Sequence, residues 1–224
     1  MFRTVLIFLL LLSQIQSNSQ NFAEFSVDNL PDSLITHEAR LKLFIQILET
    51  DTVADIGAGK MDYSLHYANL FNQTTFYFED IDSIYCNWIE LQKTIKERNF
   101  SNVDTNKISI VIGNENSTTL PTNSCDVVIL QSTLHLIAEN QKMIHDMQRI
   151  LKPNGCLLII EKFTENKNKV HPNCSTPYMT YIEMDKFMAD HELIISKDWK
   201  IIYEKNNGYS FNYIQRYIEC SFKK

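Results

Sequence analysis

Short apolar runs alternate with amphipathic segments through most of the chain. Nearly continuous apolar runs are typical of parallel strands buried on both faces, and five occur here: TVADIG, TTFYFED, KISIVIG, CDVVILQ and GCLLIIEKF. Apolar residues at helical spacing occupy the segments around them, over residues 34–48, 61–71, 84–95 and 143–151. This alternation predicts an α/β fold, with a doubly wound parallel sheet between two layers of helices.

The C-terminal part follows a different pattern. A helix is expected over residues 180–191. Two further apolar runs, DWKIIYEK and YSFNYIQRYIECSF, flank a short turn at residues 206–208. A turn of that length joins antiparallel strands, because a parallel crossover needs a much longer connection. The sequence therefore predicts one domain over residues 31–224, with a mostly parallel seven-stranded sheet that ends in a C-terminal antiparallel hairpin.

Residues 1–19 have the pattern of a secretory signal peptide. Arg3 precedes an apolar run from Val5 to Leu12, and small polar residues follow, so cleavage is expected between Ser19 and Gln20. The run is too short to cross a bilayer of about 30 Å, which takes roughly 20 apolar residues. A buried N-terminal strand or helix and an uncleaved anchor are the alternatives. The signal-peptide interpretation predicts an exported protein, periplasmic or secreted, with no stable membrane span after cleavage.

Composition narrows the class of protein. Of the 224 residues, 44% are hydrophobic, which excludes a disordered chain and suits a single buried core. Asp and Glu number 27 against 21 Lys and Arg, and this net charge of −6 argues against a nucleic-acid partner, whose phosphates attract a basic surface. The five cysteines show no CxxC or CxxH spacing, so neither a metal site nor a disulfide framework is predicted from them.

Candidate binding residues follow the ends of the first two strands. In a doubly wound sheet, ligands bind beyond the carboxyl ends of the strands. The first strand leads through Asp55 into residues 57–59, where glycines let the backbone turn tightly and approach a ligand. The second strand ends at Glu79 and Asp80, at a spacing where an acidic side chain can accept hydrogen bonds from a ribose diol. The alternatives are a tight turn without a ligand and an acidic helix start exposed to solvent.

The next strand ends carry further candidates. Asn114 follows the third strand, and its amide has both a donor and an acceptor for an adenine edge. Gln131 ends the fourth strand, and His135 follows shortly after it, where the imidazole can face a substrate or act as a general base. A structural histidine is the alternative. Three residues beyond the fifth strand form either part of a lid or ordinary packing contacts: Tyr178, Met179 and Tyr181.

Taken together, these strand ends resemble the class I S-adenosylmethionine-dependent methyltransferase family. The resemblance rests on VADIGAG, FYFEDID, IVIGNENSTTLPTNSCDVVILQSTLHLI and MQRILKPNGCLLIIEKF, and it covers residues from about 37 to 222. More narrowly, the chain is similar to exported bacterial methyltransferase-domain proteins, and its segment HPNCSTPYMTYIEM resembles their substrate-side loop. The resemblance implies a Rossmann-like sheet, S-adenosylmethionine as the cofactor and methyl transfer to a small-molecule substrate.

The resemblance also implies a role for each candidate residue. Gly57, Ala58 and Gly59 would pass beneath the methionine part of the cofactor, and Asp55 would orient this turn and reach the amino group through water. Asp80, or Glu79 in its place, would hold the ribose hydroxyls. Asn114 would touch adenine and Gln131 would lie near the sulfonium. His135 is the catalytic candidate.

Three positions depart from the family pattern. Met61 stands where a third glycine is usual, which predicts a bulkier turn and a narrower cofactor pocket. Asn114 stands at the usually acidic adenine position, a mild change, and Ser132 stands where many relatives have Asp or Asn. With the signal peptide, these departures leave open a second function, that of an exported non-catalytic protein binding another ligand or a protein partner. A nicotinamide-dependent dehydrogenase is a third alternative, but its GxGxxG pattern would need a glycine in place of Asp62.

Overall fold

The structure is a computed structural model that describes residues 47–138, 140–163, 170–171, 174–204 and 212–222. The expected signal peptide at residues 1–19 and nearly all of the helix expected at 34–48 lie outside these ranges. Within the described part of the chain, no helix is both long enough and apolar enough to cross a membrane.

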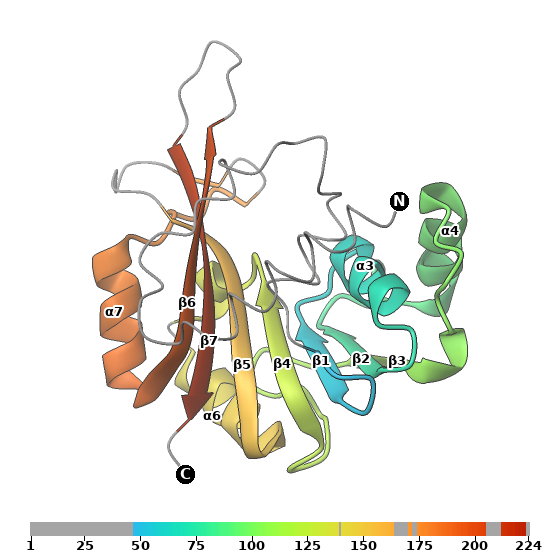
Figure 1. The fold of residues 1–224 in the computed structure, drawn as a ribbon, viewed down its shortest axis with the longest axis horizontal. Coiled ribbons are helices and arrows are strands. Elements are labelled where there is room, and N and C mark those ends of the chain that lie inside the picture. Colours follow the sequence, from blue (N-terminus) through green and yellow to red (C-terminus); the bar gives the residue numbers. More distant parts are fainter. Residues whose placement is uncertain (1–46, 139, 164–169, 172–173, 205–211, 223–224) are drawn as a thin grey trace, which may run out of the picture.

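Five parallel strands form the centre of the sheet, in the spatial order β3-β2-β1-β4-β5 (Figure 1). They are Thr52–Ile56 (β1), Thr75–Asp80 (β2), Ile108–Ile112 (β3), Cys125–Gln131 (β4) and Leu151–Phe163 (β5). The α/β fold with a parallel, Rossmann-like sheet is thus confirmed. Because the strand order reverses between β1 and β4, ligands are expected beyond the carboxyl ends of these two strands.

Two more strands extend the sheet beyond β5. They are β6 (Leu193–Glu204) and β7 (Asn212–Phe222). β7 pairs antiparallel with both β5 and β6, so that it lies between them. The turn expected at residues 206–208 lies outside the described residues.

Helices cover both faces of the sheet. On one face lie α3 (Asp62–Leu70) and α4 (Trp88–Arg98), and a short 3-10 turn, η2 (Thr105–Lys107), precedes β3. On the other face lie α5 (Leu134–Ile137), α6 (Gln141–Ile150) and α7 (Tyr181–Asp190). This is the three-layer arrangement that the alternating apolar pattern predicts.

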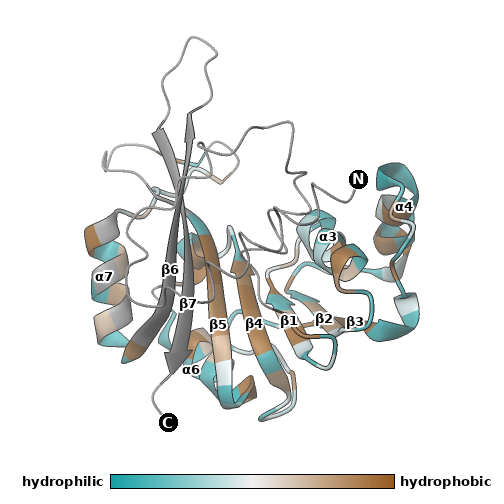
Figure 2. Cartoon of the chain, viewed as in Figure 1, coloured by the Kyte–Doolittle hydropathy of each residue, from teal (hydrophilic) through white to brown (hydrophobic). Residues whose placement is uncertain are grey.

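Each face of the sheet has its own apolar cluster, because side chains alternate along a strand. In β4, Val127 and Ile129 pack with α3 and α4, whereas Val128 and Leu130 pack with α6 and α7. Figure 2 shows the apolar residues concentrated along β1, β4 and β5. The central strands are therefore buried on both sides, which explains why they are continuous apolar runs in the sequence.

One helix is shorter than the sequence pattern predicts. The expected stripe begins at Ile84, but α4 begins at Trp88, and Ile84 is 73% exposed in the preceding turn. The side chain of Asn87 accepts hydrogen bonds from two backbone N–H groups of the first turn, and so caps the helix at that point. The polar cap, which the apolar period does not include, decides where this helix starts.

Candidate functional site

A tight turn joins the end of β1 to α3. The backbone N–H groups of Gly57 and Ala58 both donate to the carbonyl oxygen of Glu79, at 2.9 Å each. Gly57 and Gly59 have φ values of +74° and +54°, which glycine adopts without steric cost. A Cβ atom on Gly59 would meet no atom within 4 Å, so this side of the turn is open.

Asp80 is bonded directly to this turn. The Gly59 N–H donates to Asp80 Oδ2 at 2.7 Å, and the Asp82 N–H donates to Asp80 Oδ1 at 2.8 Å. A carboxylate offers about four lone-pair positions. Each oxygen of Asp80 therefore keeps a position for a further donor, while its orientation is fixed by the backbone.

Two more acidic residues are buried behind Asp80. Burial, with a smaller contribution from Asp80, raises the pKa of Asp55 to about 7, although a hydrogen bond from Ser64 opposes the rise. That bond, from Ser64 Oγ to Asp55 Oδ2, is 2.6 Å long. Burial, and then the charge of Asp80, raises the pKa of Glu79 to about 8. In the described part of the chain, Asp55 Oδ1 and Glu79 Oε1 have no hydrogen-bond partner.

Asp55 does not hold the glycine turn in the way that the family resemblance implies. Its carboxylate bonds to Ser64 on α3, whereas Gly59 is bonded to Asp80. The turn is therefore fixed from the second strand. Glu79 is buried against Gly113, where a Cβ atom would come within 1.8 Å of Glu79 Oε1.

Met61 leaves the turn open. Its backbone lies in the left-handed region, with φ of 60°, and its side chain is fully buried. The side chain belongs to the apolar cluster beneath α3 and α4, together with Leu65 and Phe78. The bulk of Met61 is therefore taken up by the core of the domain.

The end of β4 lies next to the glycine turn. Gln131 Oε1 accepts a hydrogen bond of 2.6 Å from the hydroxyl of Tyr67 on α3. Ser132 follows with φ of +55°, a conformation in which Asp and Asn are enriched. Thr133 then packs against Gly57, where a Cβ atom would lie 2.4 Å from Thr133 Cγ2. The turn after β1 and the segment after β4 are therefore in direct contact.

Asn114 lies beyond β3 and is exposed. Its Oδ1 atom accepts a hydrogen bond of 2.9 Å from the backbone N–H of Asn116. Its backbone bonds to that of Ser117 in both directions. The side-chain oxygen thus orders the local loop, which leaves the amide N–H groups as the donors that Asn114 can offer to a ligand.

His135 lies on α5 and is held by a buried carboxylate. Its Nδ1 atom is 2.9 Å from Glu161 Oε2, and the two side chains are 5% and 0% exposed. Burial alone would lower the pKa of His135, but the hydrogen bond and the charge of Glu161 outweigh burial and raise it. A buried histidine with a carboxylate partner has a fixed ring orientation, which suits a functional role.

Two residues that the sequence did not single out lie beside His135. The Sγ atom of Cys174 is 3.5 Å from His135 Nε2. The His171 ring stacks on the His135 ring, with centroids 3.8 Å apart, and Tyr178 packs against His171 at 3.7 Å. A hydrogen bond from Thr176, and then His135, lower the pKa of the Cys174 thiol. The signal that could have found the pair is the spacing His-x-x-Cys in HPNC.

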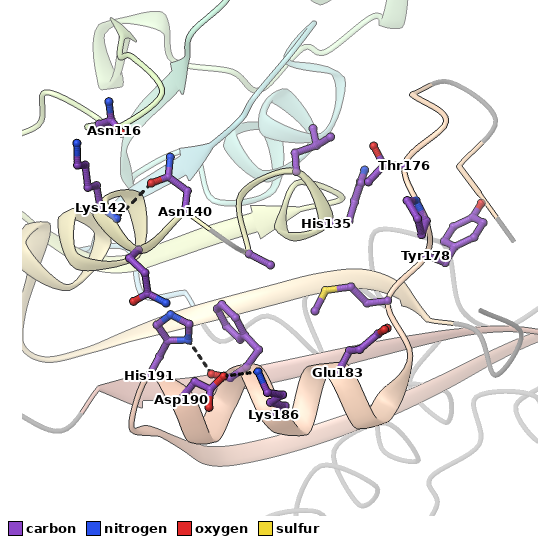
Figure 3. A pocket seen from close by; sticks show the side chains of 16 residues that line it. Asn116, His135, Asn140, Lys142, Thr176, Tyr178, Glu183, Lys186, Asp190 and His191 are labelled. Carbon is purple, nitrogen blue, oxygen red and sulfur yellow. Dashed lines mark hydrogen bonds and ion pairs between the residues drawn. The ribbon is translucent and has the colours of Figure 1, made fainter. Parts of the chain in front are cut away.

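A cavity of about 1100 Å³ opens beside His135. Residues from α5, the N-terminal end of α6, the segment before α7 and α7 itself line it, including Tyr178, Met179 and Lys186. Figure 3 shows His135 and Tyr178 at one end of this cavity, and His191 and Asp190 at the other. The glycine turn is not part of its lining, and it is connected to the cavity through Thr133 and α5.

Most of the predicted residues lie together at the ends of β1, β2 and β4, whereas Asn114 lies beyond β3 and His135 lies apart. Five of them meet where β1 and β2 end: Asp55, Gly57, Gly59, Glu79 and Asp80. Ala58 belongs to the same turn, and Gln131 lies at the neighbouring end of β4. His135 faces the separate cavity.

Comparisons with known proteins agree with this fold. Residues 54–159 match a family described as "Methyltransferase domain". No curated protein matches the chain. A SAM-dependent methyltransferase from Aquifex aeolicus has a similar structure, with a TM-score of 0.60 and 19% identity over 81% of this chain and 88% of that one. One from Methanosarcina mazei has a TM-score of 0.61 and 17% identity over 81% and 95%.

A third similar structure is that of a cyclase and not of a protein described as a methyltransferase. This [4+2]-cyclase, SpnF, shares the fold with a TM-score of 0.58 and 15% identity, over 73% of this chain and 58% of its own. At such identities a structural likeness establishes the fold, and function depends on the site.

The parallel sheet, the glycine turn and the acidic end of β2 together define a Rossmann-like domain for a cofactor with a ribose. The family match over residues 54–159, together with the similar structures, supports a class I S-adenosylmethionine-dependent methyltransferase. S-adenosylmethionine is the cofactor of this class.

The residues present fit this cofactor. The ribose offers two hydroxyl donors, and the Asp80 oxygens keep lone pairs for them. The amino and sulfonium groups are positively charged, and buried acidic oxygens of Asp55 and Glu79 lack a hydrogen-bond partner among the residues that the structure describes. The open side of Gly59 gives the backbone room to approach a ligand.

Proposed function

We propose that the chain transfers a methyl group from S-adenosylmethionine to a small-molecule acceptor in the cavity beside His135. The observation that carries this proposal is the 2.7 Å hydrogen bond from the Gly59 N–H to Asp80 Oδ2. It joins the glycine turn and the acidic strand end into one unit, so that ribose and methionine parts of the cofactor meet a preformed surface. Preformed binding groups lower the entropic cost of binding.

In this proposal, the residues at each strand end bind a different part of the cofactor. Asp80 accepts the ribose hydroxyls, and Asn114 donates to adenine from the amide nitrogen that its loop leaves available. Asp55 faces the cationic amino group, whose charge stabilises the carboxylate. Gln131, held by Tyr67, lies near the sulfonium. S-adenosylmethionine supplies an activated methyl group, so the protein chiefly aligns the acceptor and keeps it in place.

The cavity supports a small-molecule acceptor. Its volume of about 1100 Å³ lies just above the usual range of about 300–1,000 Å³ for small-molecule sites, so it has room for such an acceptor. His135 contacts the acceptor in this proposal, with its ring held in place by Glu161. Thr133 touches Gly57, and His135 follows shortly after it, so the acceptor side and the cofactor side share one segment. The net charge of −6 supports an acceptor other than nucleic acid.

Calorimetry with S-adenosylhomocysteine on the full chain tests the cofactor site. We expect a dissociation constant at or below roughly millimolar. Asp80→Ala should weaken binding about tenfold or more, because a hydrogen bond to a charged group is lost. Asp104→Ala, which removes an exposed acidic cap at η2, serves as the matched control and should bind normally. Absence of heat at high ligand concentration would refute the cofactor assignment.

An exported non-catalytic protein is the second candidate function. The apolar run at residues 5–12 supports export, and the resemblance to the cyclase SpnF illustrates that this fold carries other activities. Incubation with isotopically methyl-labelled S-adenosylmethionine and a panel of small acceptors separates the two. Labelled product supports the methyltransferase, whereas cofactor binding without any product supports the second candidate.

We also propose that the protein is exported and that its sheet has seven strands. We propose cleavage after Ser19, which N-terminal sequencing of the protein purified from its native cells will test. The antiparallel pairing of β7 with β5 and β6 supports a domain that extends over residues 31–224 and is closed by the C-terminal hairpin. A truncation before β6 should then fail to fold cooperatively.

A further inference from the structure

We propose that His135, His171 and Cys174 form a binding site for a zinc ion at the end of the cavity. Their potential ligand atoms, two imidazole nitrogens and a sulfur, all lie within 4.8 Å of one another. Imidazole nitrogen and thiolate sulfur are the ligands that zinc prefers. The inference concerns metal binding alone, so it does not depend on the proposed methyl transfer.

The distance between the ligand atoms of His135 and Cys174 already fits a bound zinc ion. Zinc binds histidine nitrogen at about 2.0–2.1 Å and cysteine sulfur at about 2.3 Å, in tetrahedral geometry. Two such ligands on one ion are separated by about 3.5 Å. The distance from His135 Nε2 to Cys174 Sγ is 3.5 Å. These two side chains therefore need little movement to bind the same ion.

His171 completes the set after a change of ring orientation. Its ring stacks on that of His135, with an angle of 10° between the ring planes. Two imidazoles on one tetrahedral ion point toward it from different directions, so binding rotates His171 out of the parallel stack. Tyr178 packs on His171 and limits how far the ring can move.

A buried carboxylate supports the site from behind. Histidine ligands commonly donate their second ring N–H to a carboxylate, which fixes the tautomer and directs the other nitrogen at the metal. Glu161 Oε2 lies 2.9 Å from His135 Nδ1, so that Nε2 is directed toward Cys174. Because the Glu161 side chain is fully buried on β5, it holds His135 in a fixed orientation.

Backbone hydrogen bonds join His171 to the residues that follow Cys174. The Ser175 N–H donates to the carbonyl of His171 at 2.9 Å, and the His171 N–H donates to the carbonyl of Thr176 at 2.8 Å. Val170 and Pro177 form a bridge outside these bonds. His171 and Cys174 are at positions i and i+3, a spacing between ligands that occurs in many zinc sites.

The site is accessible to solvent, and its three protein ligands leave one coordination position of a zinc ion open. Cys174 is exposed, so the metal can enter from solvent. His135 lines the cavity. Three protein ligands leave a fourth position for water or for an exogenous ligand, which is the arrangement found in catalytic zinc sites. A thiol or hydroxyl in the cavity is the class of ligand that fits this position.

Cobalt titration of the untagged, reduced full chain tests the proposal. Co²⁺ adopts the tetrahedral geometry of Zn²⁺, and it shows visible d–d bands and, with a thiolate, a near-ultraviolet charge-transfer band. We expect one equivalent of Co²⁺ to produce both signals and Zn²⁺ to abolish them. Cys174→Ser should lose the charge-transfer band, and because Cys174 is exposed this variant should fold normally.

Variants of His171 and of the supporting carboxylate Glu161 should each change cobalt binding. His171→Ala should weaken cobalt binding and alter the d–d bands, and Glu161→Gln should weaken it about 10- to 100-fold. His145→Ala removes an exposed histidine on α6 and is the matched control, with unchanged binding. A wild-type titration without the charge-transfer band, or a band that persists in Cys174→Ser, would overturn the proposal. Binding of S-adenosylhomocysteine is measured separately, so failure of either site is distinguishable.

Discussion

The amide nitrogen of Gly59 lies 2.7 Å from Oδ2 of Asp80, although the two residues are 21 positions apart in the sequence. One residue belongs to the turn after β1 and the other ends β2. Parallel pairing of these strands brings their carboxyl ends to one edge, and the hydrogen bond then joins them. The orientation of the Asp80 carboxylate is therefore set before any ligand arrives.

The stability of the protein should fall as the pH rises from about 5 to about 8. The pKa of Asp55 is raised from its ordinary 3.8 to about 7 by burial, so the folded state keeps a proton that the unfolded chain has already released. Raising the pH then favours the unfolded chain, and Asp55 alone should lower the free energy of unfolding by about 2–3 kcal/mol. Glu79, whose pKa is raised to about 8, acts in the same direction.

Urea unfolding at several pH values measures this dependence. Asp55→Asn cannot titrate, so its free energy of unfolding should depend less on pH than that of the wild type. Asp104→Asn changes an exposed acid and should keep the wild-type dependence. A stability that rises steadily over this interval in the wild type would contradict the assignment of raised pKa values.

Cofactor binding should release protons near neutral pH. Asp55 and Glu79, with pKa values of about 7 and about 8, are partly protonated there, and a cationic ligand favours their charged forms. The binding enthalpy of S-adenosylmethionine should therefore differ between buffers of different ionisation enthalpy, such as phosphate and Tris. Asp55→Asn should reduce that difference, and equal enthalpies in the two buffers would rule out the coupling.

A side chain at residue 57 should be costly for two separate reasons. Gly57→Ala places a Cβ atom at a φ of +74° and only 2.4 Å from Thr133 Cγ2, which should destabilise the fold by about 2–4 kcal/mol. Gly59→Ala has a positive φ but meets no atom within 4 Å, so it should cost only about 1 kcal/mol.

A double-mutant cycle separates strain from steric overlap at this position. Thr133→Ala removes the two nearest atoms and leaves Cβ at 3.1 Å from the added methyl group. The double variant should therefore be more stable than the sum of the single effects predicts, as measured by urea unfolding. Strict additivity would show that the loss in Gly57→Ala arises from backbone strain alone.

Tyr67→Phe should weaken cofactor binding more than it weakens the fold. It removes the hydroxyl that donates to Gln131 Oε1 at 2.6 Å, a bond worth about 1 kcal/mol to stability. Gln131 then loses its fixed orientation beside the glycine turn. Calorimetry with S-adenosylhomocysteine checks this, with Tyr63→Phe, on the exposed side of α3, as the control. Equal affinities in Tyr67→Phe and the wild type would remove Gln131 from the cofactor site.

The sequence predicts the central sheet well because the strands that are buried on both faces must be apolar throughout. Residues 127–130 contribute alternately to the apolar clusters on the two faces of the sheet, so the apolar run itself identifies β4. The start of α4 was predicted less well, because the apolar residue Ile84 is exposed and the polar cap of Asn87 determines where the helix begins.

The sequence predicts only those parts of the candidate site that belong to local motifs. The glycine turn and Asp80 are adjacent to strand ends, so the order of elements is enough to bring them together. The cluster of His135, His171 and Cys174 depends on where His171 and Cys174 lie relative to α5, and no local period encodes such a contact. Glu161 lies within the fifth apolar run, but its pairing with His135 depends on the alignment of β4 with β5.

The contact between Gly57 and Thr133 places a constraint on natural variation in this protein. Thr133 occupies the space that a side chain at residue 57 would need, and His135 follows it on the same short segment. Any change that enlarges residue 57 must be matched by a smaller residue at 133, and a shift of that segment would displace His135 from Glu161. Homologous sequences should therefore show these two positions changing together, and should tolerate changes on the outer surface of α4 independently.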